Sequence, residues 1–293
     1  MVELRLAETS RPSDPSAAPE VELRHVSMSF EDKQVLDDVT FRVSSGETLV
    51  LLGVTGSGKS VLLKLILGLL KPDSGQILVG GHDLVPLSET ELYPFRQRMG
   101  IVFQEGALFD SLSVYENVAY RLREGGEKNE ERIEQRVREV LRFVELEDTL
   151  EKMPAELSGG MRRRVSIART IVSQPSIMLY DSPTAGLDPV TGHTINLLIA
   201  KLRDVQGVSS LVVTHRLADA FVLANFAYSA ERQELVPVVT DGGARPCAPT
   251  RFLVLRDGAT CFWGSTEELT ATQDSYLRKF LACLRRYRRD GIQ

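Results

Sequence analysis

The sequence has little cysteine and no hydrophobic run long enough for a membrane span. Its 293 residues include three cysteines, Cys247, Cys261 and Cys283, at irregular spacing. Three cysteines so placed exclude a disulfide framework and a cysteine-ligated zinc site, and a reduced, cytosolic compartment is the expectation. The most apolar segment, VLLKLILGLL at 61–70, is interrupted by Lys64. A bilayer span needs about 20 apolar residues, so we expect a chain that does not cross a membrane by itself.

The sequence also lacks an excess of positive charge, since 35 Lys and Arg face 40 Asp and Glu and give a net charge of −5. No global attraction to nucleic acid or anionic lipid follows, and nucleic acid is not an expected partner. Hydrophobic residues make up 43% and charged residues 26%, as in ordinary globular domains. The polar, Pro- and Ser-rich residues 1–20 predict a disordered lead without a signal peptide.

Residues 53–60 read GVTGSGKS and match the pattern G-x-x-x-x-G-K-[ST]. The glycines let the backbone curl so that successive N–H groups face a polyphosphate, and the next helix adds its positive end. Lysine can reach the β- and γ-phosphates of ATP, and the final serine can ligate Mg²⁺. A merely structural glycine turn is the alternative, but the apolar strand TLVLLG before the loop favours a phosphate site. The predicted phosphate-binding residues are Gly53, Val54, Thr55, Gly56, Ser57, Gly58, Lys59 and Ser60.

Alternating strand and helix patterns follow the glycine loop. Apolar strands are predicted at MGIVFQ (99–104), SIMLYD (176–181) and SSLVVTH (209–215), with helical patterns between them. This rhythm predicts a doubly wound α/β core with an inserted α-helical subdomain over about 106–175. Together with the glycine loop, it resembles the α/β fold of P-loop NTPases with a RecA-like core. FLVLRDGATCFWG predicts a hairpin that turns at Asp257 and Gly258, and a Gly- and Pro-rich surface insertion is predicted over about 228–250.

The segment LSGGM at 157–161, followed by RRRVSIART, closely resembles the LSGGQ signature of ATP-binding-cassette (ABC) ATPases. The resemblance implies that residues 21–293 form one ABC ATPase domain. It also implies a homodimer, in which the signature of one subunit closes over the ATP held by the other. Ser158, Gly159 and Gly160 would then be nucleotide-binding residues. A helix N-terminus of this kind suits an anion.

The same resemblance gives further residues their expected roles. Phe30 stands where the family stacks an aromatic on adenine, although an ordinary core phenylalanine is the alternative. Gln104 matches the glutamine that contacts Mg²⁺ and the attacking water, although a solvated glutamine is the alternative. Asp181 matches the aspartate that holds Mg²⁺ through water, and Asp188 lies in the loop that communicates across the dimer. His215 matches the histidine that grips the γ-phosphate.

Ser182 departs from this pattern, because the family places there a glutamate that polarises the attacking water. A serine hydroxyl can bond to water but carries no negative charge near neutral pH. Loss of a positioned base costs on the order of 10²–10⁴ in rate. We favour a working, slow ATPase in which His215 or Gln104 orients the water; a nucleotide-switched scaffold without turnover is the alternative. The predicted catalytic residues are Gln104, Asp181, Ser182 and His215, and the predicted metal ligands are Ser60, Gln104 and Asp181.

The segment FQEGALFDSLSVYENVAYRLRE at 103–124 is similar to the MCE/Mla-type lipid-transport ATPases. This implies an integral-membrane permease, an MCE-domain protein as a further partner, and a location at the cytoplasmic face of the inner membrane. An ABC ATPase for another substrate is the alternative. DNA-repair ABC ATPases are excluded because 54 positions between Gln104 and Ser158 leave no room for a coiled coil. The insertion and a basic C-terminal helix over about 264–293 depart from the family pattern.

Overall fold

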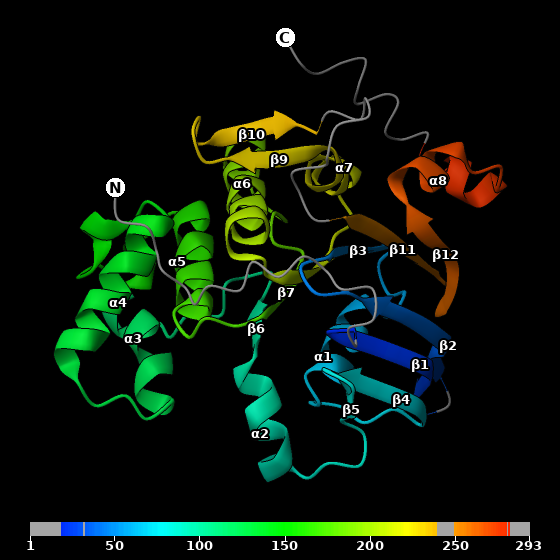
Figure 1. The fold of residues 1–293 in the computed structure, drawn as a ribbon, viewed down its shortest axis with the longest axis horizontal. Helices are drawn as coiled ribbons and strands as arrows, with labels where there is room; N and C mark the ends of the chain where they lie inside the picture. The colour runs from blue at the N-terminus through cyan, green and yellow to red at the C-terminus, as the bar shows by residue number, and fades with distance from the viewer. Residues whose placement is uncertain (1–18, 32, 239–248, 280, 282–293) are drawn as a thin grey trace.

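The structure is a computed structural model that describes residues 19–31, 33–238, 249–279 and 281 (Figure 1). Nearly all of the predicted disordered lead over 1–20 therefore lies outside the described residues. The same holds for residues 239–248 of the predicted insertion and for residues 282–293 of the predicted basic helix.

A six-stranded sheet forms the centre of the molecule, and its strand order is β12-β11-β3-β8-β7-β6. Neighbours from β11 to β6 are parallel, and β12 pairs antiparallel with β11 at the edge. This confirms the predicted α/β fold and the hairpin that turns at Asp257 and Gly258. The strands are β3 (Thr48–Gly53), β6 (Met99–Val102), β7 (Ile177–Asp181), β8 (Ser209–Val213), β11 (Thr250–Arg256) and β12 (Ala259–Ser265).

The sheet is covered on both faces, which explains why β3 is apolar at nearly every position. All six residues of β3 are buried. Leu49 and Leu51 face the core around α1 (Lys59–Ile66), whereas Val50 and Leu52 face the core that includes α7 (Leu217–Asn225). Each large aliphatic side chain so buried contributes about 1.5–3 kcal/mol.

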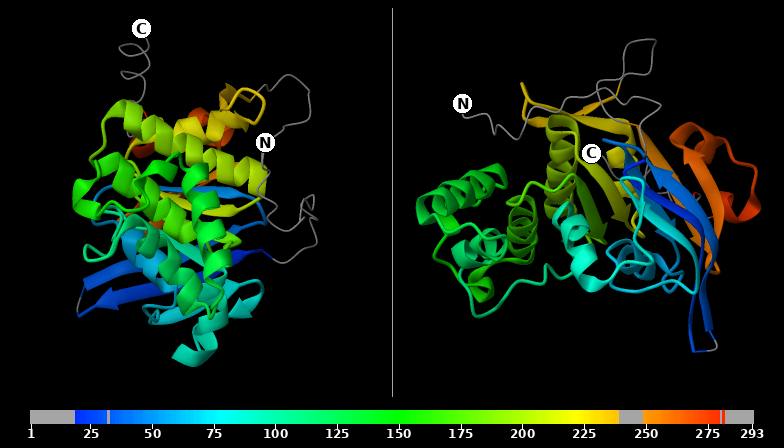
Figure 2. Two further views of the ribbon diagram at one scale, coloured as in Figure 1. Left: turned by 90° about the vertical axis from the view of Figure 1, so that its left-hand side faces the viewer. Right: turned by 60° about the horizontal axis from the view of Figure 1, so that its bottom comes forward.

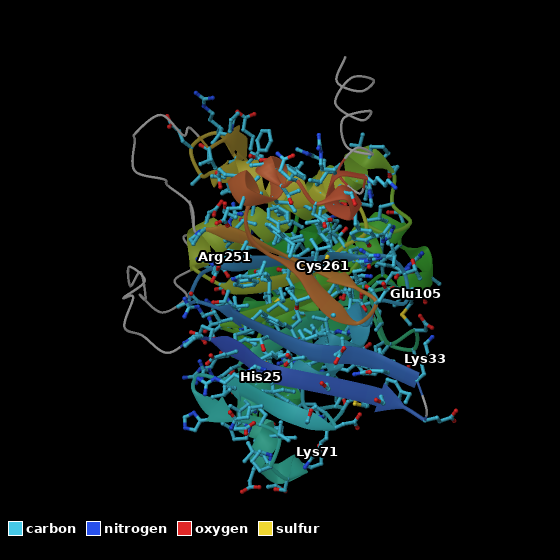
Figure 3. The ribbon with its side chains drawn as sticks, turned by 90° about the vertical axis from the view of Figure 1, so that its right-hand side faces the viewer. His25, Lys33, Lys71, Glu105, Arg251 and Cys261 are labelled. Atoms are coloured by element: carbon cyan, nitrogen blue, oxygen red, sulfur yellow. The ribbon has the colours of Figure 1, made fainter. Side chains whose placement is uncertain are left out.

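A second, antiparallel sheet closes over α1, in the order β2-β1-β4-β5 (Figure 2). In β1, Val21, Leu23, Val26 and Met28 are buried. The exposed His25 (Figure 3) interrupts this pattern at a bulge. Its Nδ1 forms a hydrogen bond with the Asp38 carboxylate at 2.7 Å. His25 is therefore a surface residue with a structural hydrogen bond. The strands are β1 (Val21–Phe30), β2 (Lys33–Val43), β4 (Ser74–Val79) and β5 (His82–Asp83).

Helices occupy most of the stretch 106–175, on the left of Figure 1. In α4 the apolar residues Ile133, Val137, Val140 and Leu141 recur at helical spacing and are all buried. They pack with α5 and with Tyr180 of the central sheet in one core, so this part is not a detached lobe. The elements are α3 (Val114–Glu124), α4 (Glu130–Phe143), η1 (Glu147–Thr149), η2 (Pro154–Glu156) and α5 (Gly159–Ile171), with α2 (Glu89–Gln97) preceding β6.

The predicted surface insertion begins as a hairpin of β9 (Phe226–Ser229) and β10 (Glu234–Pro237), packed on α6 (Pro189–Gln206). A buried ion pair holds it. Arg203 Nε donates to the Asp204 carboxylate at 2.6 Å, and Arg203 Nη2 donates to the Phe226 carbonyl at 2.9 Å. The backbone N–H of Tyr228 donates to Asp204 at 2.7 Å. The hairpin is thus attached to the core through one guanidinium–carboxylate pair.

The C-terminal region differs from the predicted helix over about 264–293. Strand β12 continues to Ser265, and α8 (Thr266–Ala271) is short. Ser265 and Glu268 form a capping box at the start of α8. Residues 272–274 are not helical, and the Asp274 side chain accepts from the N–H of Leu277 at 2.8 Å, which starts a separate turn. Helix α8 and the helical turn that begins after Asp274 are therefore separate elements within the described residues. No helix in the described ranges is long and apolar enough to span a bilayer.

We predict that Asn117→Ala destabilises the helical region. Asn117 is fully buried, and its amide bonds to the backbone of Phe109, Leu112 and Ser113 at 2.8–3.0 Å. Alanine leaves these groups without their partner, and the free energy of unfolding should fall by about 1–3 kcal/mol. Urea denaturation measures this. The exposed Gln135→Ala on α4 is the control and should change stability by less than about 0.5 kcal/mol; equal losses would contradict the assignment.

Candidate nucleotide-binding site

The carboxyl ends of the parallel strands meet at one edge of the central sheet. Leu51 of β3 is in register with Val213 of β8, and Val213 with Asp181 of β7. Val102 of β6 is in register with Tyr180. The segments that follow these strands therefore emerge together. In open α/β sheets, ligands bind at this edge.

The glycine loop follows β3 at this edge, and two of its glycines have no room for a side chain. Gly53 has φ 155°, and a Cβ there would lie 2.7 Å from the Leu255 carbonyl oxygen. Gly58 has φ 93°, and a Cβ there would lie 2.8 Å from the Val35 carbonyl oxygen. Val54, Thr55 and Gly56 are exposed at the tip. The first turn of α1 contains no acidic residue, so its positive end faces the loop without competition.

Lys59 holds the loop and carries its positive charge. Its Nζ donates to the carbonyls of Gly53 and Val54 at 2.9 and 2.7 Å, and to Ser57 Oγ at 3.1 Å. Burial lowers the pKa of Lys59, and the Asp181 carboxylate opposes this shift. The ammonium group is therefore within the loop and in the field of the aspartate at the end of β7.

The three predicted metal ligands supply oxygen donors. Ser60 and Gln104 are exposed, and Asp181 is partly exposed at the end of β7. Hydroxyl, amide and carboxylate oxygens suit Mg²⁺, which keeps several waters and binds phosphate together with one or two protein groups. In the described ranges no cluster of three His, Cys, Asp or Glu side chains could hold a metal ion, so a metal at this site would need phosphate and water as further ligands. The donor set fits Mg²⁺ bound together with a nucleotide.

Ser182 is held in a left-handed conformation with φ 50°. Such a backbone costs a non-glycine residue about 1 kcal/mol and needs support from its surroundings. Its N–H donates to the Val213 carbonyl at 2.9 Å, and its own carbonyl accepts from Ala185 N–H at 3.0 Å. Its hydroxyl donates to Asp181 Oδ1 at 3.4 Å. The serine thus presents an uncharged hydroxyl beside the predicted metal ligand.

Arg163 joins three parts of the site. It lies on α5 and is 5% exposed, and its Nη1 donates to the carbonyls of Phe103 at 3.1 Å and Ser182 at 3.4 Å. One guanidinium therefore connects the helix after LSGG, the loop that carries Gln104, and Ser182. Burial lowers the pKa of Arg163, and the Glu105 carboxylate opposes this. Sequence reasoning missed Arg163, although the run of arginines at 162–164 marks it.

The start of α5 lies against α6. Ser158 caps α5, with its Oγ accepting from the N–H of Met161 at 3.3 Å. Gly159 is exposed, and Gly160 packs so closely on Thr191 that a Cβ would collide with the threonine methyl group. No hydrogen bond joins residues 158–160 to the glycine loop at 53–60, both of which are fully described. The glycine loop lies between β3 and α1, whereas Ser158, Gly159 and Gly160 form the start of α5.

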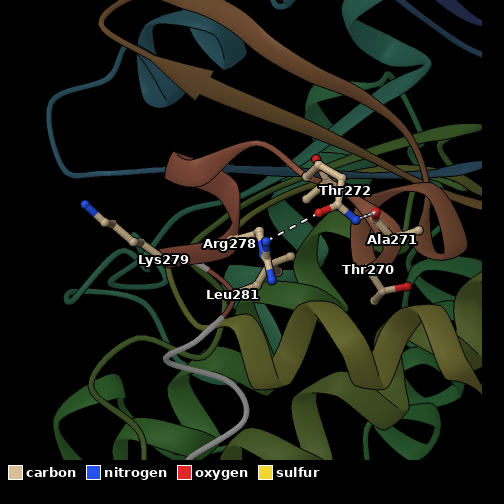
Figure 4. Close-up of a pocket in the computed structure, with 7 residues that line it drawn as sticks. Thr270, Ala271, Thr272, Arg278, Lys279 and Leu281 are labelled. Atoms are coloured by element: carbon tan, nitrogen blue, oxygen red, sulfur yellow. Dashed lines mark hydrogen bonds between the residues drawn. The ribbon is translucent and has the colours of Figure 1, made fainter.

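Phe30 and His215 complete the predicted set. Phe30 is 43% exposed at the end of β1, so it is not a core side chain. His215 follows β8 at the carboxyl edge and is also exposed. Both side chains are therefore accessible from solvent. A cavity of about 410 Å³ does occur beside α8 and is lined by Thr270, Ala271, Thr272, Gln273, Arg278, Lys279 and Leu281 (Figure 4).

A strand, a glycine loop and a helix, with an aspartate at the end of another parallel strand of the same sheet, define a P-loop nucleotide-binding protein. The family described as ABC transporter matches residues 36–185. The chain belongs to the ABC transporter family, and the part described here is its ATP-binding domain.

Relatives share this domain. The chain is 42% identical over 197 residues to the probable ribonucleotide transport ATP-binding protein mkl of Mycobacterium leprae, covering 67% of this chain and 57% of the relative. It is 33% identical over 266 residues to the intermembrane phospholipid transport system ATP-binding protein MlaF of Escherichia coli, covering 91% and 90%. The dimeric ATP-binding cassette MJ0796, bound to ADP and Pi, superposes with a TM-score of 0.69 at 30% identity, covering 84% and 98%. The chain thus spans little more than half of the mycobacterial protein.

We expect Lys59→Ala to weaken ATP binding by at least about tenfold, because it removes a charge-assisted contact to phosphate from a partly buried site. Titration with a fluorescent ATP analogue measures the affinity. Lys64→Ala is the matched control, since Lys64 is exposed farther along the same helix. Unchanged affinity in Lys59→Ala would disprove the phosphate site.

Proposed function

We propose that this chain is the ATP-binding and ATP-hydrolysing subunit of an ABC transporter, that it works as a homodimer, and that it powers lipid transport. The carboxyl edge of the sheet is the observation that carries the proposal. It brings the glycine loop, Gln104, Asp181 and His215 to one face of the chain. These groups suit binding of a triphosphate and attack by water at its terminal phosphate.

The proposed homodimer is supported by the position of the two predicted nucleotide-binding segments on different elements, the glycine loop before α1 and the start of α5. The glycine loop is open to solvent at Val54, Thr55 and Gly56, and the start of α5 offers N–H groups elsewhere on the chain. A two-fold axis lets the α5 tip of each copy cover the open loop of the other. The dimeric MJ0796 cassette, which shares 30% of its residues with this chain, supports this arrangement.

Hydrolysis depends on groups that face the terminal phosphate. The water oxygen forms a bond to the γ-phosphorus, the bond to the bridging oxygen of ADP breaks, and the proton of the water passes to an oxygen of the departing inorganic phosphate. Lys59 and the loop amides bind the phosphates, His215 holds the γ-phosphate, and Gln104 orients the water. Ser60, Asp181 and Gln104 would hold Mg²⁺, which when bound neutralises charge on the phosphates. The Ser182 hydroxyl can orient water but cannot take its proton, so we expect slow turnover.

The surface after Gln104 suits a permease. Phe109 and Tyr120 are both exposed, and their ring centroids lie 4.9 Å apart. Arg169 lies over the Phe109 ring at 5.6 Å and donates to the Ala107 carbonyl at 2.9 Å, which anchors this loop. Tyr115 lies partly buried nearby on α3. A rigid aromatic surface beside the loop of Gln104 can receive a short helix of an integral-membrane partner and respond to nucleotide.

The lipid substrate is inferred from the relatives. MlaF acts in intermembrane phospholipid transport and matches this chain over nearly its whole length. An MCE-domain partner and a place at the cytoplasmic face of the inner membrane belong to the same proposal. The mkl relative is named for ribonucleotide transport, so another substrate is the second candidate. Reconstitution of the chain with its permease in phospholipid vesicles tests this: ATP-dependent movement of labelled phospholipid supports lipid transport, and its absence beside ATP-dependent ribonucleotide uptake contradicts it.

We predict that Ser182→Glu raises the rate of single-turnover hydrolysis on the order of 10²-fold, because glutamate supplies a base where serine supplies none. Arg163, buried behind this position, favours the added negative charge. Quenched-flow measurement of phosphate release gives the rate.

Ser182→Gln is the control, since it adds a similar volume without a charge and should not accelerate hydrolysis. Equal rates in the wild type and Ser182→Glu would show that the serine does not limit turnover. A wild type without any phosphate release would favour the nucleotide-switched scaffold.

A further inference from the structure

A buried carboxylate outside the predicted site lies between two of its loops. Asp219 is on α7, and its side chain is 8% exposed. Its Oδ2 accepts a short hydrogen bond from the Thr184 hydroxyl, and its Oδ1 accepts from Asn196 Nδ2 at 2.9 Å. Arg216 Nε lies 3.4 Å from Oδ2. The carboxylate is therefore bound by a hydroxyl, an amide and a guanidinium from three different segments.

Arg216 extends these contacts to the loop of His215. Its Nη1 donates to the Thr184 carbonyl at 3.0 Å, and its backbone N–H donates to Thr214 Oγ1 at 2.9 Å. Helix α6 approaches the same guanidinium, because a Cβ on Gly192 would lie 3.3 Å from Nη1. The residues on both sides of His215 are thus fixed, and one of them is bound to the loop after β7.

Thr184 lies in the segment 182–188, which begins at Ser182 and ends at Asp188. Asp188 caps α6, its Oδ1 accepting from the N–H groups of Val190 and Thr191 at 3.0 Å each. A displacement of Thr184 therefore moves both Ser182, which lies beside the predicted metal ligand, and Asp188, which caps α6. Through Asp219 and Arg216 the same displacement reaches His215.

We propose that Asp219 is a positioning residue that makes His215 and the 182–188 segment move as one unit. As a consequence, His215, which is proposed to contact the γ-phosphate, and the loop of Asp188, which is proposed to communicate across the dimer, respond together to nucleotide. This inference rests on the proposed function, because it assigns a role to Asp219 in that same site. Rigid coupling of this kind gives cooperativity between two sites in a dimer.

Asp204 is a matched control, because it shows how much stability the chain loses when a buried carboxylate is removed away from the site. The Asp204 side chain is 5% exposed and is also paired with an arginine, but it holds the β9–β10 hairpin and has no contact with the nucleotide edge. Asp219→Asn and Asp204→Asn both remove a buried carboxylate charge that is paired with an arginine, so both should lower stability. Only Asp219→Asn should alter the site.

The experiment measures ATP affinity, kcat, KM and the Hill coefficient of hydrolysis for the full chain. A misplacement of about 1 Å at a reacting centre can cost on the order of 10²-fold in rate. For Asp219→Asn we expect kcat to fall at least about tenfold and the Hill coefficient to fall towards one, while ATP affinity stays within about twofold, since Lys59 and the loop are untouched. Asp204→Asn should retain wild-type kcat and cooperativity.

Thr184 provides a second test that does not depend on burying an unpaired charge. Thr184→Val removes the hydroxyl and should reduce kcat and cooperativity, whereas Thr184→Ser keeps the donor and should retain them. Because both groups act through one contact, Thr184→Val should add little to Asp219→Asn in the double variant.

Equal kinetic effects of Asp219→Asn and Asp204→Asn would overturn the inference, since Asp219 would then be structural only. Additive losses in the double variant would overturn it as well. A wild-type chain that does not bind ATP would overturn the proposed function and this inference with it.

Discussion

The positions of the carboxyl ends of four parallel strands are the constraint on which this site depends. The register of β3, β8, β7 and β6 brings the segments after them to one edge. At this edge the close approach of Leu255 and Val35 leaves room only for glycine at Gly53 and Gly58. The loop therefore presents backbone N–H groups to a ligand, and Lys59 adds a positive charge. Phosphate binding follows from backbone geometry as much as from any side chain.

Two arginines and one buried aspartate connect this edge to the rest of the chain. Arg163 binds the carbonyls on either side of the site, and Arg216 with Asp219 binds the 182–188 segment to the loop of His215. A guanidinium has several donors in a fixed plane, so it can satisfy two loops at once. Ser182 has an unfavourable, left-handed backbone conformation. The hydrogen bond from Arg163 to its carbonyl helps to hold it there.

Local patterns predicted the central strands and the glycine loop, because burial on both faces makes a strand such as β3 apolar throughout. Within the described residues, the predicted C-terminal helix over about 264–293 is interrupted at 272–274, where the Asp274 side chain caps a new helical turn. Arg163, Thr184 and Asp219 were not predicted. Their contacts join residues distant in sequence, and no local periodicity shows which arginine or aspartate turns inward. The roles of the predicted site residues themselves remain predictions.

The central claim is that each ATP lies between the glycine loop of one copy and the α5 tip of the other, and mixing two inactive variants tests it most directly. Lys59→Ala disables the loop, and Ser158→Arg blocks the tip. Heterodimers of the two variants contain one intact composite site and make up half of the dimers in an equal mixture. The mixture should therefore recover hydrolysis that neither variant shows alone, up to about a quarter of the wild-type rate, the value for two sites that work independently. A mixture as inactive as either variant alone, with heterodimers shown to form, would contradict the account.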